Sequence, residues 1–322
     1  MKDEIIPLNA PAADFEALVA KARAFVLASK SVNTLRGYRS DWSDWVNWTA
    51  AHQLRAFPAD STAVALYLTD RSTTLRASSL ARRLNAIAFH HHQAGVLDSP
   101  TSAPLVRATF QGIRREIGIA QSFKRALLTP EIRRIVACCP ETLAGLRDRA
   151  LILTSYAMAA RRSESAGLTA EDIEAVPEGL LVTIKKSKVD QESAGRKVGI
   201  PYGADEATCP VRALTIYMAA AGILSGFVFR AIDQKQRVSP FGLHRDSLGY
   251  IYKQAAARAG MKVEDIAGHS LRSGFCTEAA RKNVPEYLIR RQSGHKPGSK
   301  TLDRYIRLGE MFTRNAAAGV GL

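Results

Sequence analysis

Apolar residues in the first third of the chain recur at intervals of three and four positions. Phe15 and Leu18 follow this spacing, and so do Tyr38, Trp42 and Trp45 further on. This period places the side chains on one face of a helix. The segments with helical spacing or helix-capping residues are 12–29, 33–52, 61–69, 78–94 and 104–117. The sequence therefore predicts a bundle of short helices.

The rest of the chain combines helical spacing with one alternating segment. Residues 180–185 alternate as a strand does, and residues 191–195 contain turn-forming residues. Residues 197–200 are expected to form the second strand of this hairpin. A helix is also expected over 130–137, with Thr129 as its N-cap. Further helices are expected at 146–159, 209–221, 242–258, 270–282 and 285–293. The predicted fold class is mainly α with a small β-sheet or hairpin.

Length and a local run of charge divide the chain. Its 322 residues exceed what one hydrophobic core usually organises, so two domains are expected. A basic stretch begins near residue 121 and ends before the helix that starts at residue 130. We therefore expect a helical domain over 1–120, a basic linker over 121–128 and an α+β domain over 129–322.

The charge balance indicates a polyanionic partner. The sequence has 45 Lys and Arg against 30 Asp and Glu, a net charge of +15. Cations that neutralise phosphates release counterions, which makes a polyanionic partner the simplest use of this charge. The charge alone does not identify the polyanion, and surface charge can also serve solubility alone. No uninterrupted apolar run and no secretion signal are seen, so a cytoplasmic protein without a membrane partner is expected.

The sequence predicts neither a metal nor a nucleotide cofactor. Its four cysteines lack zinc-site spacing, and it has no Gly-rich loop of the ATPase type. The run His90-His91-His92 cannot converge on one ion, because consecutive helical residues diverge by about 100°. We expect these histidines on a helix surface.

Two motifs in the second part of the chain each place an arginine three residues from another ionisable side chain, an arrangement suited to phosphate chemistry. Arg161 precedes Glu164 by three residues, so on a helix the acid can hold the guanidinium in position. His269 precedes Arg272 by the same interval. The imidazole can move a proton while the guanidinium binds two phosphate oxygens. Each pair alone is more typical of an ordinary helix surface than of a phosphate site.

A third motif ends the series. Gly294-His295 is followed at short range by Thr301-Leu302-Asp303-Arg304-Tyr305, and Pro297-Gly298 between them is expected to form a turn. Three lysines, Lys185, Lys186 and Lys188, lie just before the predicted hairpin turn. The pattern alone leaves them as competing candidates for one role, or as solvated surface charge.

Together these motifs resemble the signature boxes of the tyrosine site-specific recombinases of the phage integrase family, and the N-terminal helices are similar to those of Cre-like members. The resemblance implies that Tyr305 attacks DNA, that Arg161, Arg272 and His295 stabilise the phosphate, and that His269 transfers a proton. It favours Lys188 over Lys186 as the general acid, with Glu164 in a supporting role. The expected activity is DNA cleavage and rejoining through a 3′-phosphotyrosyl intermediate and a Holliday junction, without metal or ATP.

The same resemblance implies a tetramer on double-stranded DNA with paired inverted binding elements, which places the protein at the nucleoid. The residues expected to contact the DNA backbone are Arg36, Arg39, Arg82, Arg83, Lys124 and Arg125. Leu308, Met311 and Phe312 have helical spacing and are expected to dock on a neighbouring protomer. The alternatives are a type IB topoisomerase that relaxes DNA and an accessory DNA-binding protein that has lost catalysis.

Overall fold

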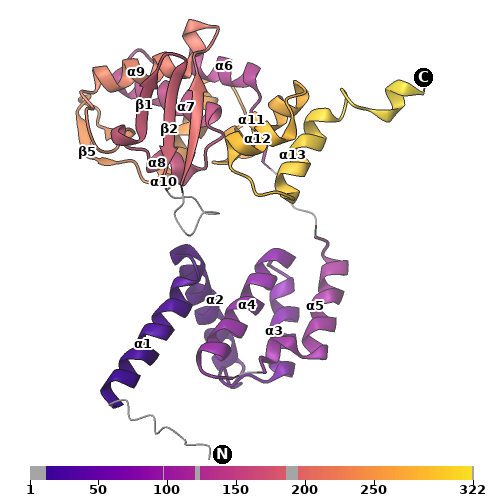
Figure 1. The fold of residues 1–322 in the computed structure, drawn as a ribbon. Helices are drawn as coiled ribbons and strands as arrows, with labels where there is room; N and C mark the ends of the chain where they lie inside the picture. Colours follow the sequence, from indigo (N-terminus) through magenta and orange to yellow (C-terminus); the bar gives the residue numbers. More distant parts are fainter. Residues whose placement is uncertain (1–11, 97, 120–123, 186–194, 321–322) are drawn as a thin grey trace, which may run out of the picture. The chain divides into compact units, whose positions relative to one another are not determined.

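The computed structural model describes residues 12–96, 98–119, 124–185 and 195–320. It consists of two compact units, Met1–Ser122 and Phe123–Leu322 (Figure 1). Each unit has its own hydrophobic core. Among the described residues, no helix is long and apolar enough to cross a membrane.

The first unit is helical. Its helices are α1 (Ala12–Ala28), α2 (Val32–Ala51), α3 (Ser61–Ser72), α4 (Ala77–Gln93) and α5 (Pro104–Glu116). The predicted segments 12–29, 33–52, 61–69, 78–94 and 104–117 match these helices to within a few residues. Trp45, Tyr67 and Leu80 are fully buried where α2 packs on α4 and α3 packs on α5. Asp60 caps α3 by accepting hydrogen bonds from the backbone N–H groups of Thr62 and Ala63.

The run of three histidines is only partly on the surface. His91 is fully buried, and its Nε2 accepts a hydrogen bond from the backbone N–H of Ala59 at 2.9 Å. Its Nδ1 therefore carries the proton and donates to the carbonyl of Ile87 at 2.8 Å. His90 stacks on Trp42 with ring centroids 4.4 Å apart. The expectation of a helix surface is wrong for His91, because its two hydrogen bonds satisfy it inside the bundle.

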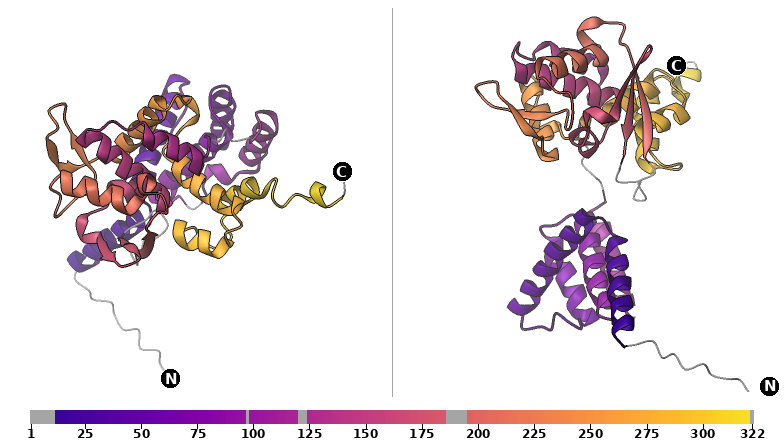
Figure 2. Two further views of the ribbon diagram at one scale, coloured as in Figure 1. Left: turned by 90° about the horizontal axis from the view of Figure 1, so that it is seen from above. Right: turned by 60° about the vertical axis from the view of Figure 1, so that its left-hand side comes forward.

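The second unit surrounds a small antiparallel sheet with helices (Figures 1 and 2). The sheet contains β1 (Ile173–Val176), β2 (Gly179–Ile184) and β3 (Arg196–Pro201) in that order, and β4 (Arg230–Ile232) pairs with β5 (Val238–Gly242). The helices are α6 (Thr129–Ala137), α7 (Leu143–Ala157), α8 (Arg162–Ala166), α9 (Pro210–Ala220), α10 (Arg245–Arg258), α11 (Ser270–Arg281), α12 (Glu286–Ser293) and α13 (Lys300–Glu310). The mainly α fold class with a small sheet is confirmed.

Two local predictions in this unit are wrong. The N-cap of α6 is Leu128, whose N–H donates to Glu131, while the Thr129 hydroxyl lies 3.0 Å from that of Tyr156. Helix α10 begins at Arg245, because Gly242 pairs with Arg230 in the β4–β5 ladder. Thr129 and Gly242 each make a tertiary contact, which rules based on local sequence do not take into account.

The tail after α13 differs from the predicted helical stripe. Leu308 lies in α13, but this helix ends at Glu310, so Met311 and Phe312 follow it in a turn. All three side chains are exposed, with Phe312 at 85%. A short 3-10 helix, Ala316–Gly319, comes later.

The end of the predicted linker packs on the second unit. The Lys124 ammonium donates to the carbonyl of Glu264 at 2.5 Å, and the backbone N–H of Arg125 donates to that of Asp265 at 2.7 Å. Leu127 is buried and its N–H donates to the carbonyl of Ser270. Residues 124–128 are therefore part of the second unit rather than a free connection.

Candidate active site

Arg272 lies in the first turn of α11 and is almost fully buried, at 4% exposed. Its Nη1 donates to the carbonyls of Ala159 and Ser293, each at 2.6 Å. The backbone of Ala159 is left-handed, with φ 45°, which turns its carbonyl to this position. Burial, together with the nearby Arg161, lowers the pKa of Arg272 to about 10. The guanidinium therefore stays charged at neutral pH.

Arg161 is held by Glu164 across the start of α8. Its Nη1 donates to Oε1 of Glu164 at 2.5 Å, and its backbone N–H donates to Oε2 at 2.9 Å. Its Nη2 reaches the carbonyl of Gly294 at 3.4 Å. The Glu164 side chain is fully buried, so its carboxylate interacts with protein groups rather than with solvent. The contact that the three-residue spacing predicts is therefore present.

His295 lies between a serine and Arg272. Because a guanidinium only donates, the 3.1 Å contact from Arg272 Nη2 makes Nε2 of His295 an acceptor. The proton then belongs on Nδ1, which donates to the Ser293 hydroxyl at 2.7 Å. Burial, followed by the nearby Arg272, Arg161 and Arg196 in that order, lowers the pKa of His295 to about 3. In this DNA-free state the imidazole is neutral.

Tyr305 projects from α13 beside this group of residues. Its ring centroid is 6.2 Å from that of His295, at an interplanar angle of 66°. The Arg304 guanidinium lies 5.3 Å from the Tyr305 ring centroid. The turn expected at Pro297-Gly298 is present, and Ser299 caps α13 after it. The short loop between His295 and α13 thus brings Tyr305 close to His295.

Close packing fixes α13 on α11, and the two helices lie side by side (Figure 1). A Cβ added at Gly309 would meet the backbone carbonyl oxygen of Thr277 at 2.4 Å. Leu302 of α13 packs with Cys276 and Ala280 of α11 in a small buried cluster, against which Tyr305 is half-buried. The helix that carries Arg272 therefore also supports the tyrosine.

His269 is the N-cap residue of α11 and is exposed, three positions before Arg272. The residue before it, Gly268, lies against Arg162, because a Cβ there would meet Arg162 Cδ at 1.9 Å. The spacing of this motif therefore places the imidazole at the start of the helix, as the sequence predicts.

Sequence reasoning missed one cationic residue of this cluster, Arg196. It begins β3, and its guanidinium donates to Glu164 Oε2 at 3.3 Å and to the carbonyl of Gln292 at 2.8 Å. The predicted strand began one residue later, which left Arg196 outside it. The buried Val198 and Ile200 alternate with it along the strand, and this period could have indicated its inward direction. We name Arg161, Glu164, Arg196, Arg272 and His295 the arginine cluster.

Of the three candidate lysines, only Lys185 lies within the described residues. Lys185 forms an ion pair with Asp172 at 2.6 Å, which raises the pKa of Lys185. Lys186 and Lys188 lie outside the described residues, so the choice between them stays a prediction.

The predicted DNA contacts of the first unit fall into two kinds. Arg36 and Arg39 are exposed on α2. Arg82 forms a two-pronged ion pair with Asp41, and Arg83 binds Asp44 at 2.5 Å. These ion pairs hold α4 on α2, so Arg82 and Arg83 have a structural role whether or not they also contact DNA.

In the second unit, Arg125 pairs with Glu131, and Lys124 is exposed beside Glu264. Their contact with DNA stays a prediction. The described residues contain no group of three His, Cys, Asp or Glu side chains that could hold a metal ion.

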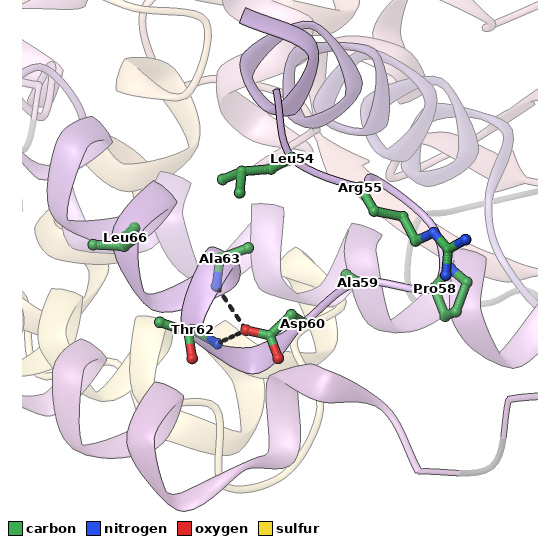
Figure 3. Close-up of a pocket in the computed structure, with 8 residues that line it drawn as sticks. All are labelled: Leu54, Arg55, Pro58, Ala59, Asp60, Thr62, Ala63 and Leu66. Atoms are coloured by element: carbon green, nitrogen blue, oxygen red, sulfur yellow. Dashed lines mark hydrogen bonds between the residues drawn. The ribbon is translucent and has the colours of Figure 1, made fainter. Parts of the chain in front are cut away.

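A separate hollow lies in the first unit, between the end of α2 and α3 (Figure 3). Its lining includes the apolar Leu54, Pro58 and Leu66, together with Arg55. The carboxylate of Asp60, which also lines it, is directed to the N-terminus of α3 (Figure 3). The hollow shares no residue with the arginine cluster.

Comparison with known proteins gives consistent matches. A model described as the phage integrase family matches residues 125–310. The "Integrase/recombinase xerD homolog" of Selenomonas ruminantium is 36% identical over 311 residues, 96% of this chain and 91% of that protein. The "Tyrosine recombinase XerD" of Corynebacterium glutamicum is 28% identical over 283 residues, 84% of this chain and 86% of that protein.

Solved structures agree in fold. A lambda integrase dimer bound to a COC′ core site is similar with a TM-score of 0.61 and 14% identity, covering 95% of this chain and 82% of that one. A lambda integrase tetramer bound to a Holliday junction has a TM-score of 0.56 and 16% identity, covering 90% and 76%.

Proposed function

Because the chain belongs to the phage integrase family and is a tyrosine site-specific recombinase, we propose that Tyr305 is its nucleophile and that the arginine cluster binds the scissile phosphate. The observation that carries this proposal is the position of the Tyr305 ring, 6.2 Å from the ring of His295, which Arg272 contacts directly. A phosphate oxygen and an attacking phenol need to meet at such a place.

In the first step the Tyr305 oxygen attacks phosphorus, and the bond from phosphorus to the 5′ oxygen breaks. Arg161, Arg272 and His295 stabilise the charge that develops on the non-bridging oxygens. His269 accepts the phenol proton, and Lys188 donates a proton to the departing 5′ oxygen. The product is a 3′-phosphotyrosyl link, which a 5′ hydroxyl of the partner strand then attacks to reverse the step.

His295 changes its proton state in this proposal. In the DNA-free state Nε2 accepts from Arg272, so the imidazole has no proton to offer a phosphate oxygen there. A bound phosphate brings negative charge next to His295 and raises its pKa. The histidine then takes up a proton on Nε2 and becomes a donor.

The assembly that we propose is a tetramer on double-stranded DNA with paired inverted elements. Strand exchange in this tetramer passes through a Holliday junction. The lambda integrase tetramer bound to a Holliday junction supports it as a similar fold. The exposed Leu308, Met311 and Phe312 supply an apolar surface for a neighbouring protomer. The protein would work on DNA in the cytoplasm, at the nucleoid.

The test of the nucleophile is Tyr305→Phe, which keeps the ring and removes the attacking oxygen. We expect the variant to bind its site and to form no covalent complex. The site is first mapped by sequencing genomic fragments that the variant retains. A nicked duplex of that sequence then traps the adduct, which is scored as an SDS-resistant band.

Tyr287→Phe is the matched control, because Tyr287 is an exposed tyrosine on the neighbouring α12. The control should form the adduct at the wild-type rate. An SDS-resistant adduct with Tyr305→Phe would assign the nucleophile to another residue.

A further inference from the structure

Arg196 joins three chain segments of the second unit. It lies on β3, donates to Glu164 of α8, and donates to the carbonyl of Gln292 near the end of α12. Its side chain is 19% exposed. A guanidinium with these partners is held in place on several sides and faces the protein rather than solvent.

The register of the sheet fixes this direction. Arg196 pairs with Ile184 across the β2–β3 ladder, and Ile184, Val198 and Ile200 are all buried. Residues two apart on a strand share a face, so Arg196 points to the core side. Lys197, the next residue, is exposed on the other face.

Glu164 depends on two arginines. Its Oε2 accepts from the backbone of Arg161 and from the side chain of Arg196, and its Oε1 accepts from the side chain of Arg161. A buried carboxylate that loses one charged partner moves toward the other or takes up a proton. Either change would alter the hold of Glu164 on Arg161.

The segment before His295 depends on Arg196 as well. Its guanidinium holds the carbonyl of Gln292, while the side chain of Gln292 donates to the carbonyls of Ala157 and Gly199. A Cβ added at Gly294 would lie 2.6 Å from Arg196 Nε, so the chain wraps closely around the guanidinium. His295 is the next residue.

The charges in this group do not balance. Within the described part of the chain, the arginine cluster holds three guanidiniums and one carboxylate. Burial lowers the pKa of Arg196 more than the nearby Glu164 raises it, and repulsion by Arg161 lowers it as well. Keeping a third buried cation here costs free energy that a bound phosphate offsets.

We propose that Arg196 is a positioning residue for the phosphate-binding site: it fixes Glu164 and the 292–294 segment, and through them Arg161 and His295. This rests on the proposed function of the cluster. Arg196 itself does not need to touch the DNA.

The test compares single-turnover cleavage by Arg196→Gln and by wild type on two nicked duplexes. One carries the ordinary scissile phosphodiester and the other a methylphosphonate, which has no negative charge at that position. We expect cleavage of the phosphodiester to fall by about 10- to 100-fold, as for other groups that orient a functional side chain. On the methylphosphonate the variant should come within about threefold of wild type, because the charge to be stabilised is gone.

Lys197→Gln is the matched control, since it removes a positive charge from the adjacent position on the solvent face. It should cleave both duplexes at wild-type rates. Arg196→Lys keeps the charge but cannot donate to Glu164 and Gln292 in a fixed fork, so it should lose most of the activity that Arg196→Gln loses.

Several results would overturn the proposal. Equal losses on both substrates, with a lowered melting temperature, would make Arg196 an ordinary structural residue. A loss of half-site affinity as large as the loss of rate would make it a DNA-backbone contact, and unchanged rates would leave it without a role. A wild-type protein that forms no adduct would instead contradict the proposed function.

Discussion

At the scale of single residues, the arginines of the cluster are engaged before any substrate arrives. Arg272 is held by two carbonyls and Arg161 by a buried carboxylate. Groups that are already in position need little reorganisation when charge develops on a phosphate. Their contribution is therefore expected in the rate of cleavage more than in binding.

Arg161→Ala and Arg272→Ala should each slow cleavage by at least about 100-fold, the usual cost of removing one donor from a developing oxyanion. Half-site affinity should change by less than about tenfold, because many other phosphates are contacted. Glu164→Gln should have a milder effect, since it keeps the shape of the carboxylate. Adduct formation and gel shifts on the same duplex measure the two quantities. If rate and affinity fall together, the arginines are backbone contacts.

The neutral state of His295 predicts a pH dependence of stability. Its folded pKa, about 3, lies below its ordinary value of 6.5, so the unfolded chain binds the proton first as pH falls. Stability from this group is complete above pH 6.5 and declines as the pH falls toward 3. His295→Gln has no proton to bind and should lose less stability over this interval.

The measurement is the melting temperature of both proteins between pH 7 and pH 4. Exposed His92 supplies the control, because His92→Gln should follow the wild-type curve. Parallel curves for wild type and His295→Gln would show that His295 titrates normally in the folded protein.

At the scale of secondary-structure elements, the position of the nucleophile depends on the contact between α11 and α13. Gly309→Ala should separate these helices, because the new Cβ would meet the Thr277 carbonyl oxygen at 2.4 Å and Ala280 Cβ at 2.8 Å. Overpacking of this kind costs about 1–3 kcal/mol of unfolding free energy. Cleavage should fall as well, since Tyr305 lies on the displaced helix.

Gly112→Ala is a matched control, because Gly112 lies within α5 and no atom is within 4 Å of its added Cβ. This change should be neutral or stabilising. Denaturant melts and adduct formation measure both effects. Wild-type cleavage by Gly309→Ala would mean that α13 does not set the position of the tyrosine.

Much of the secondary structure could be predicted from the sequence, because periodic apolar residues and helix caps are local signals. The helices of the first unit and the β2–β3 hairpin are where the spacing places them. The strand β1 and the β4–β5 pair were missed, since short strands depend on partners distant in sequence. The family and the activity were predicted from motifs and are confirmed.

The candidate site was less accessible to sequence reasoning. Arg161, Arg272 and His295 were named from the resemblance of their short motifs to the family's signature boxes, and they lie close together in the structure. The contacts of Arg196 could not be predicted in this way, since they join it to Glu164, 32 residues away, and to Gln292, 96 residues away. The helical extent of the tail was wrong, because apolar spacing at Met311 and Phe312 does not require a helix on an exposed segment.

At the scale of the whole molecule, two of the described segments carry several exposed apolar side chains. One is α1, where Phe15, Leu18 and Phe25 are each at least 60% exposed. The other is the segment after the nucleophile, with Met311 and Phe312. Side chains of this size in solvent are typical of surfaces that associate.

Met311→Ala combined with Phe312→Ala should weaken assembly and leave the fold intact, because both side chains are exposed within the chain itself. The loss should be about 2–5 kcal/mol, by analogy with the removal of large apolar anchors from a buried site. Gel shifts on one half-site and on a paired site measure affinity and cooperativity separately. Phe241→Ala, at another exposed phenylalanine of the second unit, is the control. Unchanged cooperativity, or a lowered melting temperature of the free protein, would exclude docking by this tail.

The excess positive charge of the arginine cluster also limits what the active site can recognise. Every phosphodiester in a genome presents the same non-bridging oxygens, so guanidiniums and an imidazole cannot tell one step of the duplex from another. Phosphate contacts in the catalytic centre therefore do not distinguish one base sequence from another. Discrimination has to come from side chains that reach base edges or respond to duplex deformability. Attempts to redirect this recombinase to new sites should leave the cluster unaltered and vary the surfaces around it.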